Sequence, residues 1–439
     1  MSDENIILDK HVSYLSLIAW KHRLVFWIGA IVVGLVIVVL TWLSEWTTQT
    51  YHALSLHYPW FQFIIPPIGM GLTAWLTFRF FPGSERSGIP QIKAALELSN
   101  TLADRAQLVS IRISFGKVLL TMMGLLSGAS VGLGGPAIHL GASIMLSLGK
   151  ITKFPSHYME KGLILAGSAA GFAAMFSTPL AGIIFAIEEM GRNLEERLSS
   201  LVLTAIIFSG VTAYALINRY IYFGDESLLI MPWGRSWLAV PLCGIVGGFL
   251  GGLFSKVIIL GIRLLNQLDI SFILVAIICG GVIAVVNYLS GNATVGTGYQ
   301  QIKLILKGIQ PMEPSYPLLK MMATCATFFS GIPSGIFVPS LATGAGIGVN
   351  LANWFPLAPL SAMILLTMTA YFSGMLQSPL TSFVIVMEMT NSHEILIPLM
   401  AAAFLANGTS KLIHPVPLYV ALFNASKYHL NKPVKSNGN

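Results

Sequence analysis

The chain has 439 residues, of which 55% are hydrophobic and only 10% are charged, with a net charge of +7. A soluble globular domain carries about 25% charged residues, so these few charges cannot cover a water-facing surface, and most of the surface must face lipid. The basic balance does not indicate nucleic acid binding, because the cytoplasmic loops of membrane proteins collect Lys and Arg, and the sequence contains no zinc-finger, basic-region or RNA-binding pattern.

The N-terminal segment, residues 1–23, is expected to lie in the cytoplasm. It opens with acidic residues rather than the basic start of a cleavable signal peptide, and a basic triplet, Lys21–Arg23, precedes the first apolar run. That run, Leu24–Leu43, is twenty residues without a charge, long enough to cross a hydrocarbon core of about 30 Å as a helix. Basic flanks stay on the cytoplasmic side. The tail at 424–439 is also basic, so we expect both termini in the cytoplasm.

Long stretches without Asp, Glu, Lys or Arg make up much of the remaining chain. The longest, Met321–Met387, has 67 residues, enough for two to three membrane spans, and Gly and Pro interrupt it repeatedly. In lipid, broken backbone survives only where protein or a water-filled cavity covers it. The pattern therefore predicts an all-α integral membrane protein with many short, broken or re-entrant helices.

The chain also repeats itself weakly at an offset of 200 residues. Residues 171–190, GFAAMFSTPLAGIIFAIEEM, match 371–390, YFSGMLQSPLTSFVIVMEMT, in Phe, Met, Pro-Leu and Glu. Chance similarity between two apolar segments is the alternative. Paired broken helices in two weakly similar halves are typical of transporters, whose substrate site lies between the halves. The predicted organisation is a first membrane repeat (24–218), a polar connection (219–233) and a second membrane repeat (234–423).

Three short segments have the sequence of a helix start. They are SGIPQIKAAL from Ser87, GLGGPAIHL from Gly132 and SGIFVPSLA from Ser334. Ser is a good N-cap, and Pro is tolerated in the first helical turn. A helix N-terminus presents unpaired N–H groups and a partial positive charge, which suits an anion. If the three ends converge in the membrane, they can hold chloride weakly enough for it to leave, as conduction requires.

In this order, the three segments resemble the signature regions of the CLC family of chloride channels and chloride/proton exchangers. The family reads GSGIP, G-[KR]-E-G-P-x-x-H and GxFxP, where this chain has RSGIP, GLGGPAIH and GIFVP. The sequence AAGFAAMFSTPLAGIIFAIEEM and the PLY of Pro417–Tyr419 are also similar to the family, and the match spans about Leu24–Phe423. The first motif departs at Arg86, where the family has Gly. The resemblance implies a CLC-type domain of two repeats and a homodimer with one pore in each subunit.

The resemblance implies roles for four residues of a central anion site. Ser87 would offer its hydroxyl and Tyr419 its phenol to a chloride, and the backbone N–H groups of Ile336 and Phe337 would complete the site. Without the resemblance, Ser87 would be interpreted as an N-cap only, and Tyr419 as an aromatic residue at the membrane interface.

Two positions bear on proton coupling. At Gly134 the family carries a glutamate whose carboxylate plugs the outer anion site and swings away when protonated, and this chain has no side chain there. Glu189 matches the internal glutamate that hands protons inward in exchangers. Intramembrane acids are functional candidates, but Glu188 and Glu189 could instead lie at a helix end, capped or paired with Arg192. Lys117 either adds positive potential along the pore or snorkels toward water.

We therefore expect passive, channel-like chloride transport that is uncoupled from protons because Gly134 stands at the gate position. A chloride/proton antiporter that uses another protonatable group is the alternative, and an intramembrane hydrolase is a distant one. No cofactor and no metal site is expected, since the three cysteines, Cys243, Cys279 and Cys325, lie in apolar runs at unsuitable spacings. The expected partners are chloride, the lipid bilayer and a second copy of the chain, and the expected location is the bacterial inner (plasma) membrane.

Overall fold

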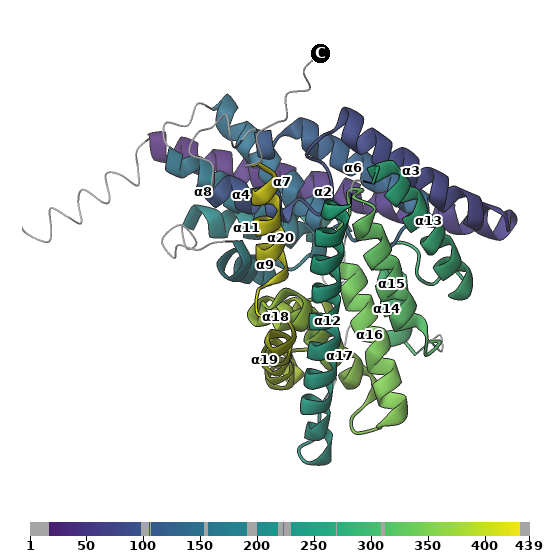
Figure 1. Cartoon of the computed structure of the whole chain (residues 1–439). Helices are drawn as coiled ribbons and strands as arrows, with labels where there is room; N and C mark the ends of the chain where they lie inside the picture. The colour runs from purple at the N-terminus through teal and green to yellow at the C-terminus, as the bar shows by residue number, and fades with distance from the viewer. Residues whose placement is uncertain are drawn as a thin grey trace, which may run out of the picture.

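The computed structural model describes residues 17–97, 105, 107–152, 157–190, 200–217, 223, 230–268, 270–308 and 312–430. Across these residues the ordered elements are helices (Figure 1). In the first half they are α2 (Leu17–His57), α3 (Phe61–Phe80), α4 (Ile89–Glu97), α6 (Ile111–Leu126), α7 (Gly134–Ile151), α8 (His157–Phe176), α9 (Pro179–Phe185), the π-helix η1 (Ala186–Met190) and α11 (Ser200–Ile217). In the second half they are η2 (Arg235–Leu238), α12 (Ala239–Gln267), α13 (Phe272–Leu289), α14 (Tyr299–Leu306), α15 (Tyr316–Phe329), α16 (Phe337–Trp354), α17 (Leu360–Leu376), α18 (Pro379–Thr390), η3 (His393–Ile395), α19 (Leu396–Ile413) and α20 (Leu418–Leu430).

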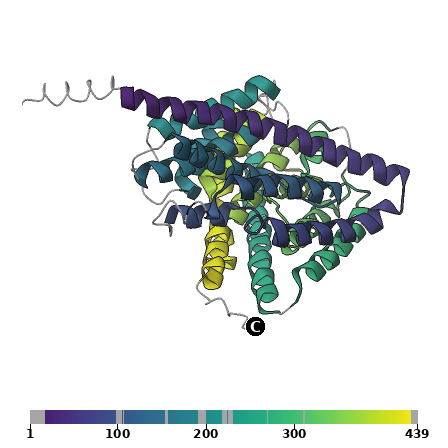
Figure 2. The ribbon, with the colours of Figure 1, turned by 90° about the horizontal axis from the view of Figure 1, so that it is seen from above.

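The two halves of the chain pack in the same way. In the first half α2, α8 and α11 pack on one another and α7 packs on α8; in the second half α12, α17 and α19 pack together and α16 packs on α17. Most helices of the first half form the upper part of the molecule in Figure 1, and most of those of the second half lie below, whereas α13 lies beside α3 and α20 reaches up among the helices of the first half. Figure 2 shows α2 running along one whole edge. The prediction of two repeats is confirmed.

Two reciprocal contacts join the repeats. Glu388 accepts hydrogen bonds from N–H groups in the first turn of α9 at 3.2 and 2.8 Å, and Glu188 accepts them from the first turn of α18 at 3.1 and 2.7 Å. Gly132 and Gly335 exchange two backbone hydrogen bonds of 2.8 Å across an antiparallel bridge. A carboxylate at a helix N-terminus is stabilising because it compensates the helix dipole. In each contact the two halves contribute equivalent residues, Glu188 and Glu388 in the first and Gly132 and Gly335 in the second. The weak sequence repeat therefore marks structurally equivalent positions.

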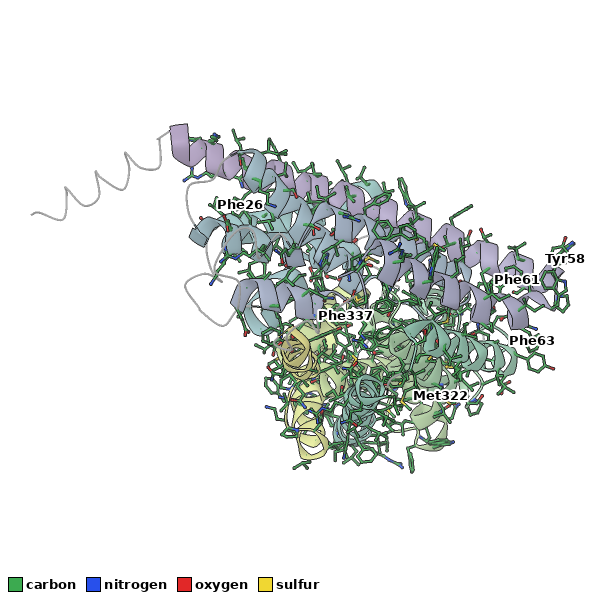
Figure 3. The ribbon with its side chains drawn as sticks, turned by 45° about the horizontal axis from the view of Figure 1, so that its top comes forward. Phe26, Tyr58, Phe61, Phe63, Met322 and Phe337 are labelled. Atoms are coloured by element: carbon green, nitrogen blue, oxygen red, sulfur yellow. The ribbon has the colours of Figure 1, made fainter. Side chains whose placement is uncertain are left out.

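Six described helical segments are long and apolar enough to cross a membrane: Arg23–His57, Phe61–Phe80, Ser200–Ile217, Arg235–Gln267, Phe272–Leu289 and His393–Ala425. In Figure 3, Phe337 lies in the middle of the molecule, whereas Tyr58, Phe61 and Phe63 lie together at the far end of the α2–α3 pair. Many large apolar side chains of these segments are exposed, as lipid-facing residues must be.

The stretch Met321–Met387 was expected to form two to three membrane spans, and the structure instead places parts or all of four helices in it. It holds most of α15, all of α16 and α17, and most of α18, which have 14, 18, 17 and 12 residues. Most side chains of α16, α17 and α18 are buried. Because protein rather than lipid covers these helices, each can be shorter than the hydrocarbon core.

The domain boundaries remain predictions, although two of them fall within helices. Helix α2 already begins at Leu17, so it crosses the expected boundary between residues 23 and 24. Helix α20 continues to Leu430, past the expected end of the second repeat at 423. The polar connection at 219–233 lies largely outside the described residues.

Candidate anion site between the repeats

The three motifs lie together where α4, α7 and α16 begin. The N–H of Ser334 donates a hydrogen bond of 3.3 Å to the carbonyl of Arg86, which joins the third motif to the first. A Cβ built on Gly135 would lie 2.5 Å from the carbonyl oxygen of Ser87, so the start of α7 can approach the first motif this closely only with glycine. The helix starts that the sequence predicts at separate places in the chain therefore meet at one site.

Ser87 and Tyr419 are buried in this site and their hydroxyls lack partners. Ser87 is 0% exposed and Tyr419 1%, and the two hydroxyls lie close together without the geometry of a hydrogen bond to any described protein group. Ser87 does not cap α4 through its side chain, so its interpretation as an N-cap only is wrong, and Tyr419 is buried among protein groups rather than exposed. A buried hydroxyl without a partner costs about 1–3 kcal/mol, and an anion could accept from both.

The start of α16 adds backbone donors beside these hydroxyls. The ring of Phe337 lies 5.9 Å from the ring of Tyr419, centroid to centroid, which places the first residue of α16 next to the phenol. Among the described residues, the N–H groups of Ile336 and Phe337 donate no hydrogen bond, because they precede the first intrahelical bond of α16. Hydroxyl and backbone donors at a helix N-terminus make a site of partial positive charge.

Lys117 lies beneath the loop that leads to Ser87. Its side chain is 0% exposed, and its ammonium donates to the carbonyls of Ser84, Glu85 and Arg86 at 2.9, 3.3 and 3.2 Å. The snorkelling alternative is wrong, because the ammonium is buried on backbone carbonyls instead of reaching water.

Gly134 is the first residue of α7, and aromatic rings crowd it. A Cβ built on Gly134 would lie 2.9 Å from Cδ2 of Phe337 and 3.3 Å from Cζ of Phe176. Its φ is not in the left-handed region, so the backbone conformation does not require glycine. What limits this position is the space left by the two rings.

Glu189 is held by partners from two other helices. One carboxylate oxygen lies 2.5 Å from the ammonium of Lys93 on α4, and the other accepts a 2.8 Å hydrogen bond from the hydroxyl of Ser378 before α18. The side chains of Lys93 and Glu189 are 8% and 4% exposed. The carboxylate is also close enough to Tyr419 to interact electrostatically. The partner suggested by the sequence, Arg192, lies outside the described residues.

Lys93 is a candidate site residue that sequence reasoning missed. It lies in the first motif, SGIPQIKAAL, six residues after Ser87, as the one charge in that segment. Its partner is 96 positions away in the sequence. A lone cation inside an apolar helix was a usable signal, but the identity of its partner depends on the fold.

These features define an integral membrane protein with a candidate anion site between two repeats. The chain belongs to the voltage gated chloride channel family, whose sequence profile matches residues 69–411. The recognition of the CLC family from the motifs is confirmed.

Curated relatives and solved structures agree with this assignment. The chain is 29% identical over 366 residues to the H(+)/Cl(-) exchange transporter ClcA of Yersinia pestis, covering 79% of this chain and 74% of the relative. It is 29% identical over 387 residues to the protein of the same name from Cronobacter sakazakii, covering 83% and 80%. The fold resembles that of a slow cyanobacterial Cl-/H+ antiporter, with a TM-score of 0.78, 23% identity and coverage of 93% and 99%. It also resembles a CLC-type fluoride/proton antiporter, with a TM-score of 0.74, 22% identity and coverage of 92% and 98%.

Proposed function

We propose that this protein transports chloride across a membrane through the site formed by Ser87, Tyr419 and the N–H groups of Ile336 and Phe337. The observation that carries the proposal is the pair of buried hydroxyls without a protein partner beside the start of α16. Both can donate to an anion, and neither brings a full positive charge that would hold the ion too tightly. Membership of a chloride channel family and the names of the curated relatives support this function and disfavour the hydrolase alternative.

The finer proposal is that chloride moves without obligatory proton exchange. Gly134 has no side chain that could compete with the anion or carry a proton. Glu189 is paired with Lys93, so a proton on its carboxylate would leave a buried ammonium without its counter-charge. Breaking a buried ion pair on one side costs about 3–5 kcal/mol. Both observations argue against a proton path through these two positions.

The second candidate is a chloride/proton antiporter that uses another protonatable group. The relatives from Yersinia pestis and Cronobacter sakazakii are both named exchange transporters, and these names favour this candidate over the first. The chain also retains the buried carboxylate of Glu189 near Tyr419. An exchanger would have to move protons past the ion pair with Lys93.

The assembly and the location follow from the same family resemblance. We propose a homodimer with one pore per subunit in the bacterial inner membrane, with both termini in the cytoplasm. Size-exclusion chromatography with light scattering in detergent tests the dimer. A particle with the mass of one chain would contradict it.

Reconstitution into liposomes distinguishes the two candidates. The vesicles are loaded with chloride, a potassium ionophore dissipates the voltage, and chloride and proton movements are recorded together. Uncoupled transport predicts chloride efflux without stoichiometric proton uptake. A fixed ratio between the two fluxes would establish the antiporter, and its loss in Glu189→Gln would assign the proton path to Glu189. The absence of chloride flux would refute both candidates.

A further inference from the structure

Arg86 has a backbone conformation that its side chain disfavours. Its φ is +55°, in the left-handed region where residues other than glycine are strained. The residue lies directly before Ser87, and its carbonyl accepts hydrogen bonds from the N–H of Ser334 and the ammonium of Lys117. Strained backbone that persists in a fold is a reason to look for a function of the side chain.

The guanidinium of Arg86 has no protein partner in the described part of the chain. None of its nitrogens donates a hydrogen bond to a described residue, and its Nε is buried without one. The acid that acts on it electrostatically is its neighbour Glu85, without an ion pair between them. One oxygen of Glu85 accepts a 2.8 Å hydrogen bond from the N–H of Gly83 instead. The five donors of Arg86 thus have no acceptor among the described residues, and the side chain is partly exposed.

Arg86 lines a cavity of about 440 Å³ at the place where α3 and α12 end and α4 and α13 begin. Its other polar lining residues are Glu85, Gln91 and Asn266, and the side-chain oxygen of Gln91 also lacks a hydrogen bond. Most of the wall is apolar and is formed by Phe78, Leu108, Ile262, Phe272, Phe328 and Leu422. A cavity of this size with apolar walls and a few polar groups is typical of a site for a small organic ligand.

We propose that this cavity binds an anionic amphiphile, with its carboxylate or phosphate head on Arg86 and its apolar body against the aromatic wall. The planar guanidinium matches an oxyanion through two parallel hydrogen bonds, which chloride cannot accept in that way. The apolar wall excludes a bare inorganic ion as the best-fitting occupant. The head group can belong to a bilayer phospholipid or to a soluble organic acid. Binding of this ligand can be measured without any chloride flux.

Binding to the purified full chain tests the proposal with two probes. Phosphatidylglycerol and the zwitterionic phosphatidylcholine are compared by native mass spectrometry, and octanoate is titrated by calorimetry. The variants are Arg86→Gln, Arg86→Gly, which relieves the backbone strain, and Arg79→Gln as a control. Arg79 is an exposed cation at the end of α3 that does not line the cavity.

We expect wild type and Arg79→Gln to bind alike, and both Arg86 variants to bind about tenfold or more weakly, since charged hydrogen bonds are lost. Arg86-dependent retention of phosphatidylglycerol assigns the head group to a lipid, and Arg86-dependent octanoate binding assigns it to a soluble acid. If neither probe distinguishes wild type from folded Arg86→Gly, the proposal is overturned.

Discussion

Replacing Gly134 by glutamate should create a gate that closes near neutral pH. The new Cβ would lie 2.9 Å from Cδ2 of Phe337, so this ring must move by a few tenths of an ångström. Overpacking of this kind costs about 1–3 kcal/mol of stability, and no backbone strain adds to it, because φ is not left-handed. A carboxylate in a partly buried position at a helix N-terminus gains up to about 2 kcal/mol. That free energy corresponds to a ratio of roughly thirty between the carboxylate bound in the anion site and the carboxylate swung out of it.

Chloride efflux from liposomes measures this gate. Flux through Gly134→Glu should fall by roughly ten- to thirtyfold near neutral pH. Acid should restore it only below about pH 4.3, the usual pKa of glutamate, because the helix start stabilises the ionised carboxylate and protonation removes the charge that holds it in the site. Gly134→Gln has a similar size and does not titrate, so its flux should not recover in acid. Equal inhibition in both variants, insensitive to pH, would refute the reasoning and show that the position only needs to be small.

Three further predictions concern the residues around this gate. Ser87→Ala and Tyr419→Phe should each weaken chloride binding about tenfold, because a hydrogen bond to a charged group is worth about 1.5–3 kcal/mol. If calorimetry finds unchanged chloride binding in both variants, the site lies elsewhere. Lys93→Met should lower the free energy of unfolding by about 3–5 kcal/mol, because Glu189 is left unpaired. The double variant with Glu189→Gln should recover much of this loss. If Lys93→Met alone is as stable as the wild type, the ion pair contributes little to stability. Glu388→Gln should lower stability by about 1 kcal/mol because the charge at the start of α9 is lost, which a thermal melt would detect, and an unchanged melting temperature would contradict the capping role.

The helix starts and the repeat were predictable because they depend on local chemistry. Gly and Pro at the starts of α4, α7 and α16 have short-range conformational preferences that hold in any fold, although the expected serine caps do not form, since the hydroxyls of Ser87 and Ser334 make no hydrogen bond. Glu188 and Glu388 occupy matching places in the repeat, and the structure gives both the same role at opposite helix starts. Their sequence positions indicated an equivalence, whereas the cross-repeat hydrogen bonds became visible only in three dimensions.

The partners of buried charges were not predictable in this way. Lys93 meets Glu189 across 96 positions, so the pairing depends on how α4 packs against η1 and α18. The crowding of Gly134 by Phe337 likewise joins residues of opposite repeats. Arg86 was recognisable as a departure from the family motif, but its unpaired guanidinium and its cavity depend on the ends of α3, α12 and α13. These features depend on packing between residues that are far apart in the sequence. The hydrophobic periodicity of a single segment carries no information about that packing.

The most direct test of the account is a simultaneous record of chloride and proton movement in liposomes that contain the wild-type protein. With voltage controlled by an ionophore, a proton gradient is imposed in the absence of a chloride gradient. The account predicts that chloride stays at equilibrium, because neither Gly134 nor the Lys93-paired Glu189 passes protons in exchange for it. Chloride driven uphill at a fixed ratio to protons would contradict the account and identify the protein as a chloride/proton antiporter.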